Sequence, residues 1–217
     1  MSVTSHVATL PSGPLVLASS STTRRRLLER AGFDISIRAA TIDETAIRAS
    51  CAGEGIEPGD VAVILAEMKG KAAFLKGSVG PGQLLLAADQ ILEIEGDMLG
   101  KPSDRDAAAR QLARLQGRTH RLFTAAVIMR DGVRIWHHLA TNELSMRSLT
   151  DTEIEGYLDV VGHAALWSPG SYQIESVGMH LFSRIDGCHY AILGLPVLEI
   201  TAFLRQHGLR LTRSDAS

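Results

Sequence analysis

The sequence of 217 residues contains few cysteines and no long apolar run. Its two cysteines, Cys51 and Cys188, lie far apart and form no Cys-x-x-Cys pair, which favours a reducing compartment over a secreted disulfide scaffold. No apolar stretch approaches the roughly 20 residues that a bilayer-spanning helix needs. Residues 1–14 lack the charged start and apolar middle of a signal peptide. These absences predict a cytoplasmic protein with no membrane partner.

The chain also has no excess of positive charge and few aromatic side chains. The formal net charge is −2, and aromatic residues make up 5% of the chain. The protein therefore has neither an overall basic field nor many aromatic surfaces for stacking bases, and we expect no nucleic-acid partner. The composition, with 45% hydrophobic and 21% charged residues, is typical of a globular chain that folds without a disulfide or a structural metal.

Strand and helix patterns alternate along the chain. The apolar runs at 15–18 and 84–88 predict buried strands, and the spacing of apolar residues over 60–75 predicts a long amphipathic helix. Asp131 and Gly132 form a hairpin signal between the strands expected at 122–129 and 133–138. Because a hairpin interrupts the alternation, we expect an α/β fold with a mixed central sheet and helices on both sides.

The remaining segments are predicted in the same way. Strands are expected at 35–39, 142–147, 179–185 and 190–193, a loop at 51–59, and helices after the capping-box patterns at Ser103 and Thr150 and after Pro196.

The first predicted strand is followed by hydroxyl side chains and arginines. Ser19, Ser21 and Arg24 stand at the expected start of a helix. Hydroxyls, free backbone N–H groups and an arginine at a helix N-terminus form a site for phosphate. The alternative is that Ser21 or Thr22 only caps the helix and the arginines lie on a solvated face.

Three carboxylates and one lysine are further candidates for chemistry. Asp89 directly follows the strand at 84–88, where it could bind a divalent metal or act as a general base, or simply form a turn. Lys101 lies between Gly100 and Pro102 and suits a phosphate, although no Walker A pattern is present. Glu44 and Glu175 are candidate carboxylates or ordinary surface charges.

Several short motifs occur together in a fixed order. They are Leu17-Ala18-Ser19-Ser20-Ser21-x-x-Arg24-x-x-Leu27-Leu28, Ile42-Asp43-Glu44, Leu65-Ala66-x-x-Lys69, Ala88-Asp89-Gln90, Gly100-Lys101-Pro102, Gly117-x-x-His120, Gly170-Ser171-Tyr172 and Gly194-Leu195-Pro196. In this order the motifs resemble the Maf family of nucleoside triphosphate pyrophosphatases, and the resemblance covers about residues 15–207.

This resemblance implies a fold and a reaction. The fold would be a curved mixed sheet with a cleft, similar to Maf and inosine triphosphatase-like proteins, in a single domain over residues 15–210. Residues 1–14 would then be a flexible leader and residues 211–217 a flexible tail. The reaction would be hydrolysis of a nucleoside triphosphate to the monophosphate and pyrophosphate with a divalent metal, Mg²⁺ or Mn²⁺, and a homodimer is implied.

The resemblance also implies roles for individual residues. Asp89 would be the proton acceptor, and Arg24, Lys69 and Lys101 would hold the triphosphate. Further substrate-binding positions would be Ser19, Thr23, Gln90 and Glu175. The metal would be bound by Asp89 and Glu44. Gln90, Ser171 and Glu175 are similar to the 7-methyl-GTP subgroup. Thr23, Ile174 and Ser176 match neither that subgroup nor the dTTP/UTP subgroup. A carboxylate at Glu175 could accept the adjacent N–H donors of guanine.

Two other functions remain open from the sequence. One is a broad pyrophosphatase for non-standard triphosphates, including dTTP and UTP. The other is a nucleotide-sensing regulator of cell division or septum formation without significant catalysis.

Overall fold

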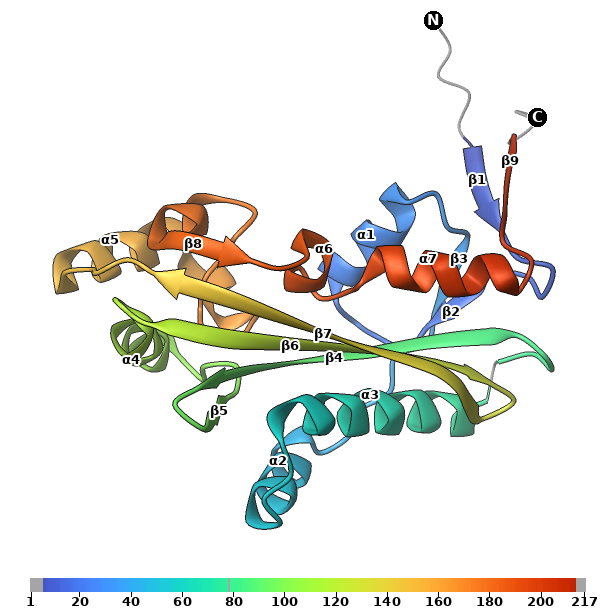
Figure 1. Cartoon of the computed structure of the whole chain (residues 1–217), viewed down its shortest axis with the longest axis horizontal. Coiled ribbons are helices and arrows are strands. Elements are labelled where there is room, and N and C mark those ends of the chain that lie inside the picture. Colours follow the sequence, from blue (N-terminus) through green and yellow to red (C-terminus); the bar gives the residue numbers. More distant parts are fainter. Residues whose placement is uncertain (1–5, 78, 214–217) are drawn as a thin grey trace, which may run out of the picture. The chain divides into compact units, whose positions relative to one another are not determined.

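The computed structural model describes residues 6–77 and 79–213 (Figure 1). Its strands are β1 (His6–Thr9), β2 (Leu15–Leu17), β3 (Ile35–Ile37), β4 (Leu84–Ile94), β5 (Asp97–Leu99), β6 (Thr119–Arg130), β7 (Val133–Met146), β8 (Phe182–Asp186) and β9 (Arg210–Arg213). Its helices are α1 (Thr22–Arg30), α2 (Glu44–Gly53), α3 (Pro58–Leu75), α4 (Arg105–Leu115), α5 (Asp151–Val161), α6 (His189–Ile192) and α7 (Val197–Gln206), with 3₁₀ turns η1 (Gly162–Leu166) and η2 (Val177–Leu181).

The main sheet contains both parallel and antiparallel pairs. Its strand order is β3-β2-β4-β6-β7-β8, and β5 pairs with β4. Strand β2 is parallel to β3 and to β4, with Leu17 opposite Ile37 and Leu86, whereas β5 and β8 run antiparallel to their neighbours. Asp131 and Gly132 join β6 to β7, as the hairpin signal predicts. The predicted mixed α/β fold is therefore confirmed.

The residues group into two compact units. Unit 1 comprises Met1–Asp89, Thr124–Ala140 and His189–Ser217, and unit 2 comprises Gln90–Phe123 and Thr141–Cys188. Strands β4, β6 and β7 contribute residues to both units. The single domain over residues 15–210 stays a prediction.

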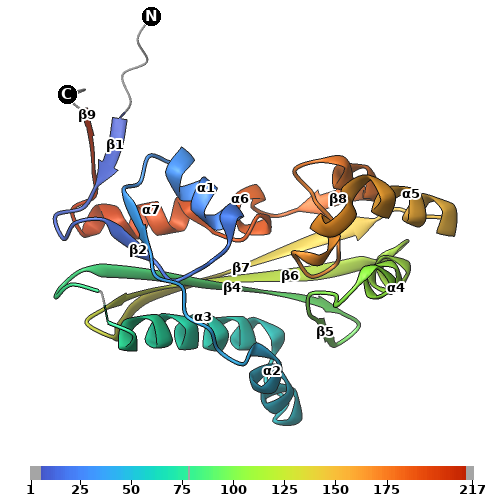
Figure 2. The same cartoon turned by 180° about the vertical axis from the view of Figure 1, so that it is seen from behind.

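Helices cover both faces of the part of the sheet that belongs to unit 1. Figures 1 and 2 show α1 and α7 on one face and α3 on the other. Leu84, Leu86 and Ala88 of β4 are buried in one cluster with residues of α1 and α7. Because successive strand residues point to opposite faces, Leu85 and Asp89 point toward α3.

Helix α3 lies close against β4 because of a glycine. The predicted helix is confirmed, but the face that it buries differs in part from the predicted one. Val61 and Leu65 are buried, whereas Met68 and Leu75, which follow the same helical spacing, are 39% and 82% exposed. A Cβ atom added to Gly70 would lie 3.4 Å from the Cβ of Ala87 and 2.5 Å from the Sδ of Met129. A side chain at this position would have to displace Met129, so the glycine favours the close approach that places Lys69 near the sheet.

Unit 2 contains α4 and α5, which pack together and against η1. Thr150 and Glu153 form the predicted capping box of α5 through reciprocal hydrogen bonds. Helix α4 is capped differently from the prediction, because Asp104 is the N-cap and its carboxylate accepts the backbone N–H of Ala107.

Several local predictions differ from the structure. The loop expected at 51–59 is confined to residues 54–57, since α2 continues to Gly53 and α3 begins at Pro58. The strand expected at 190–193 falls mainly within helix α6. The periodicity of so short an apolar segment does not distinguish a strand from a buried helix. The strands expected at 133–138 and 142–147 are confirmed as parts of the single strand β7. The strand expected at 179–185 begins only at Phe182, because residues up to Leu181 belong to the 3₁₀ turn η2.

The chain ends differ in part from the expected leader and tail. Residues His6–Thr9 pair antiparallel with Arg210–Arg213, although the sequence predicts no regular element in either segment. The rest of the tail beyond residue 213, and residues 1–5 of the leader, lie outside the described residues. Within residues 6–77 and 79–213, none of the helices combines the length and apolarity of a membrane span.

Candidate active site

Asp89 is the buried carboxylate at the centre of the site. It lies in β4 on the face toward α3, and only 3% of its surface is exposed. Its Oδ1 accepts a hydrogen bond of 2.5 Å from the ammonium of Lys69 in α3. Its Oδ2 is buried and has no hydrogen-bond partner. A buried ionised oxygen without a partner is costly, so Asp89 holds one oxygen ready for a ligand or a proton.

Lys69 connects two carboxylates. Besides Asp89, its Nζ lies 2.7 Å from Oε1 of Glu44, the first residue of α2. Helix α2 starts there because the carboxylate of Asp43 caps it by accepting the backbone N–H of Ala46. The ammonium therefore orients Asp89 and Glu44 together through charge-assisted hydrogen bonds.

Arg48 completes this charged cluster and was missed by sequence reasoning. Its Nη2 lies 3.0 Å from Oε2 of Glu44 and 3.9 Å from Oδ2 of Asp89. Its Nε is buried without a hydrogen-bond partner. The spacing of Glu44 and Arg48, four residues apart on a helix, is the signal that could have identified it.

Arg24 is held at the end of β2 by three protein oxygens. Its Nε donates to the carbonyl oxygen of Gly194 at 3.0 Å, and its Nη1 donates to the carbonyl oxygen of Ala88 at 2.8 Å and to the hydroxyl of Ser19 at 3.4 Å. Burial lowers the pKa of the Arg24 guanidinium from its usual value, while the charges of Asp89 and Glu44 partly offset this effect. The site thus contains a third cation close to its two carboxylates.

The start of α1 resolves the alternative that the sequence left open there. Ser21 is the N-cap, and its hydroxyl accepts the backbone N–H of Arg24. The next arginine, Arg25, is exposed and pairs with Glu29 at 3.7 Å. Capping and a site arginine therefore occur together, because only Arg24 of these two arginines faces Asp89.

The structure brings together some of the predicted site residues. Ser19, Arg24, Glu44, Lys69 and Asp89 gather in unit 1.

The other predicted residues are Thr23, Gln90, Lys101 and Glu175. Thr23 is half-buried in α1. Gln90, Lys101 and Glu175 belong to unit 2, where Gln90 is half-buried and both Lys101 and Glu175 are exposed.

The donor set is suited to a hard cation that also has other ligands. In the described part of the chain, no group of three or more His, Cys, Asp or Glu side chains could hold a metal. Asp89 and Glu44 supply carboxylate oxygens, and Asp89 Oδ2 has no hydrogen-bond partner. Mg²⁺ and Mn²⁺ favour such oxygens, and Mg²⁺ is commonly bound by one or two carboxylates plus phosphate and water.

The chain is similar to proteins of one family over most of its length. A family model described as Maf-like protein matches residues 14–207. A nucleoside triphosphate pyrophosphatase of Paramagnetospirillum magneticum is 43% identical over 193 residues, covering 89% of this chain and 98% of the relative. Nucleoside triphosphate pyrophosphatase 1 of Jannaschia sp. is 44% identical, covering 90% and 97%. A 7-methyl-GTP pyrophosphatase of Brucella abortus is 42% identical, covering 88% and 95%. The chain belongs to the family of Maf-like proteins.

Proposed function

We propose that this Maf-family hydrolase converts a guanine-type nucleoside triphosphate, such as 7-methyl-GTP, to the monophosphate and pyrophosphate. The observation that carries the reaction is the carboxylate of Asp89, buried with one oxygen held by Lys69 and the other without a hydrogen-bond partner. The names of the relatives support pyrophosphate release from nucleoside triphosphates.

Asp89 acts as the general base in this reaction. Its Oδ2 accepts a proton from water, the water oxygen bonds to the α-phosphorus, and the bond from that phosphorus to the bridging oxygen breaks, so pyrophosphate leaves. Lys69 fixes the carboxylate through Oδ1, which leaves Oδ2 as the proton acceptor. A carboxylate oriented in this way is pre-organised for proton transfer.

The cations of unit 1 stabilise the negative charge of the triphosphate. Lys69, Arg48 and Arg24 carry fixed positive charges near Asp89, and each is already oriented by protein oxygens. Fixed cations of this kind stabilise charge that develops on phosphoryl oxygens. Lys101 of unit 2 is the further phosphate ligand that the family motif Gly-Lys-Pro suggests.

A divalent cation, Mg²⁺ or Mn²⁺, would be held by Asp89 and Glu44. When bound, it would neutralise phosphate charge, as in other phosphoryl-transfer enzymes.

Two observations support a guanine-type base. The Brucella abortus relative carries the name 7-methyl-GTP pyrophosphatase. Glu175 is exposed, and its carboxylate could accept the N1–H and N2–H groups of guanine, whereas a pyrimidine carbonyl in the same place would be repelled. Gln90, directly after Asp89, adds a side-chain amide with both a donor and an acceptor.

Pyrophosphate release over a panel of triphosphates tests the proposal. We expect 7-methyl-GTP and GTP to be cleaved faster than UTP and dTTP in the presence of Mg²⁺ or Mn²⁺. The variant Asp89→Asn keeps the shape of the side chain and removes the base, so turnover should fall on the order of 10²–10⁴-fold. Asp159→Asn, at an exposed carboxylate that pairs with Arg105, serves as the matched control and should retain turnover.

Two outcomes would contradict the proposal. Wild-type turnover in Asp89→Asn would remove Asp89 from the reaction. Retained nucleotide binding without pyrophosphate release from any triphosphate would favour a nucleotide-sensing regulator.

A further inference from the structure

A strained loop in unit 2 follows Gly170. Ser171 is fully buried and has a φ of 61°. Two other non-glycine residues in the described part of the chain have positive φ, Glu95 and Asp131, and each precedes a glycine in a two-residue hairpin turn. Ser171 is in no hairpin, so the surrounding structure must impose its left-handed conformation.

Side chains from two helices hold this loop. The side-chain oxygen of Gln111 in α4 accepts the backbone N–H of Gly170 at 2.9 Å. The hydroxyl of Tyr157 in α5 donates to the carbonyl oxygen of Ser171 at 3.2 Å and accepts the backbone N–H of Gln173 at 2.8 Å. Burial raises the pKa of Tyr157 to about 12, so its hydroxyl keeps the proton that it donates.

His120 of β6 provides a further attachment. It is 1% exposed, and its Nε2 lies 3.0 Å from the hydroxyl of Tyr172, whose ring meets the ring of Phe182 edge-on at 4.9 Å. The Nδ1 of His120 is buried without a hydrogen-bond partner. Burial lowers the pKa of His120 to about 4, with the charge of Glu93 opposing this effect, so the imidazole is neutral at physiological pH.

The loop ends in a closed turn that displays one carboxylate. The backbone N–H groups of Ser176 and Gly178 both donate to the carbonyl oxygen of Gln173, at 3.0 and 3.1 Å. The first of these bonds closes a four-residue turn in which Ile174 is buried and Glu175 is exposed. Glu175 is therefore presented from backbone that is fixed on both sides.

The polar pair of His120 and Tyr172 is not explained by stability alone. Two apolar side chains of similar shape would fill the same space without an unpartnered Nδ1, and such replacements are often neutral or stabilising. The pair also belongs to the motifs Gly117-x-x-His120 and Gly170-Ser171-Tyr172, to which the proposed reaction assigns no role. A directional hydrogen bond does what apolar packing does not, because it fixes the position of the Tyr172 side chain within the loop.

We propose that His120 is a positioning residue for recognition of the nucleobase. Through its hydrogen bond to Tyr172 it fixes the loop that presents Glu175 to the N–H donors of guanine. This inference rests on the proposed function. It means that His120 influences the base specificity of the enzyme without contacting the substrate.

The test compares base discrimination in variants of His120. In His120→Leu the hydroxyl of Tyr172 loses its partner, and we expect the ratio of kcat/KM for GTP over UTP to fall about tenfold, mainly through KM for GTP. The inhibition constant of GMP should rise in parallel, while that of inorganic pyrophosphate should stay the same. His120→Gln keeps a hydrogen-bonding group and should restore most of the discrimination.

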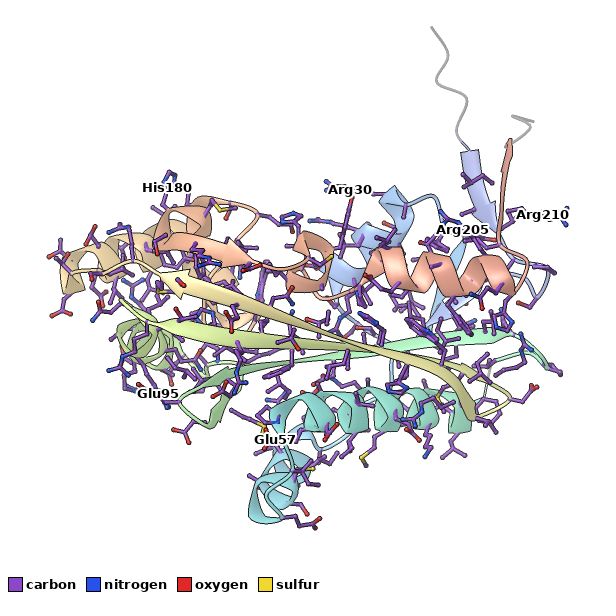
Figure 3. The ribbon with its side chains drawn as sticks, viewed as in Figure 1. Arg30, Glu57, Glu95, His180, Arg205 and Arg210 are labelled. Carbon is purple, nitrogen blue, oxygen red and sulfur yellow. The ribbon has the colours of Figure 1, made fainter. Side chains whose placement is uncertain are left out.

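His180 offers a matched control within unit 2. It lies in η2, and Figure 3 shows its side chain at the surface, pointing away from the ribbon. His180→Gln should leave the GTP over UTP ratio and the GMP inhibition constant at wild-type values.

A second pair of variants separates positioning from stability. Tyr172→Phe removes only the hydroxyl and keeps the ring against Phe182, so it should lower discrimination as His120→Leu does. If His120→Leu folds poorly, Tyr172→Phe is the variant that tests the hydrogen bond. The double variant His120→Leu/Tyr172→Phe leaves neither polar atom of the pair behind, and its thermal midpoint should recover relative to His120→Leu. Its discrimination should remain low, because the loop has still lost its directional bond.

Two results would overturn the inference. Unchanged discrimination in both single variants would do so, and so would discrimination that recovers together with stability in the double variant. If the wild type releases no pyrophosphate from any triphosphate, the proposed function fails instead. The loop is then tested by titrating GMP into the wild type and His120→Leu, and equal affinities would overturn the inference.

Discussion

The buried His120 should make the protein less stable in mild acid. In the folded chain its pKa is about 4, whereas the ordinary value, which applies to the unfolded chain, is 6.5. Between these values the unfolded chain binds more protons than the folded one, so stability rises with pH through this window. The contribution is fully present above about 6.5 and is lost as the pH falls toward 4.

The magnitude follows from the difference between the two pKa values. At 1.36 kcal/mol per pKa unit, the pKa values of 6.5 and about 4 correspond to about 3 kcal/mol of unfolding free energy. The nearby carboxylate of Glu93 does not hold the imidazole in its charged form, because Glu93 is already paired with Arg121 at 2.7 Å and accepts the backbone N–H of Gly96. The hydroxyl of Tyr172 bonds only Nε2, so a protonated ring would bury an unpaired Nδ1–H.

Urea unfolding followed by circular dichroism between pH 4 and 8 measures this effect. Other titrating groups also change stability with pH, so the informative quantity is the difference in unfolding free energy between the wild type and His120→Gln. That difference should shift by about 3 kcal/mol against the wild type between pH 7.5 and pH 4. His180→Gln, an exposed histidine in the same unit, should run parallel to the wild type. Parallel curves for the wild type and His120→Gln would refute the reasoning.

Three further outcomes are expected from the packing and the charges of unit 1. Lys69→Met should lower kcat/KM on the order of 10²-fold, because Asp89 and Glu44 lose their shared ammonium. Its control, Lys71→Met, breaks only a surface ion pair and should match the wild type in steady-state assays. Arg48→Gln should lower kcat/KM by about tenfold, a smaller loss than Lys69→Met, and equal losses in the same assay would count against this ranking. Gly70→Ala should reduce the unfolding free energy by about 1–3 kcal/mol in urea titrations, because the added Cβ would meet Met129 and Ala87. Its control, Gly53→Ala, places a Cβ in open space and should be neutral or slightly stabilising in the same titrations.

The fold could be predicted where a local pattern carries the structure. The apolar residues of α3 recur at helical spacing, and the run at 84–88 is continuous, so both elements follow from the sequence. The segment at 190–193 carries no such pattern, and its short helix packs Ala191 and Ile192 into the interior. There the tertiary environment decides between strand and helix.

The site could be predicted in part, for a related reason. Asp89 is recognisable as a carboxylate that follows an apolar run, and the family motifs point to Lys69 and Glu44. The contact of Lys69 with Asp89 depends on how closely α3 packs on β4, which no pattern within either segment shows. Arg48 depends on the same packing, because its partner Glu44 is brought to Lys69 only by the folded chain.

The two-residue alternation of side chains along β4 restricts where the chain tolerates insertions and deletions. Ala88 and Leu86 point into the apolar cluster with α1 and α7, while Asp89 points toward α3 and its ammonium partner. An insertion or deletion of one residue between Leu84 and Asp89 would turn the carboxylate into that apolar cluster and expose a leucine or alanine to Lys69. We therefore expect related genes to vary in length in the turn at 79–83 before β4, and to keep the number of codons from Leu84 to Asp89 unchanged.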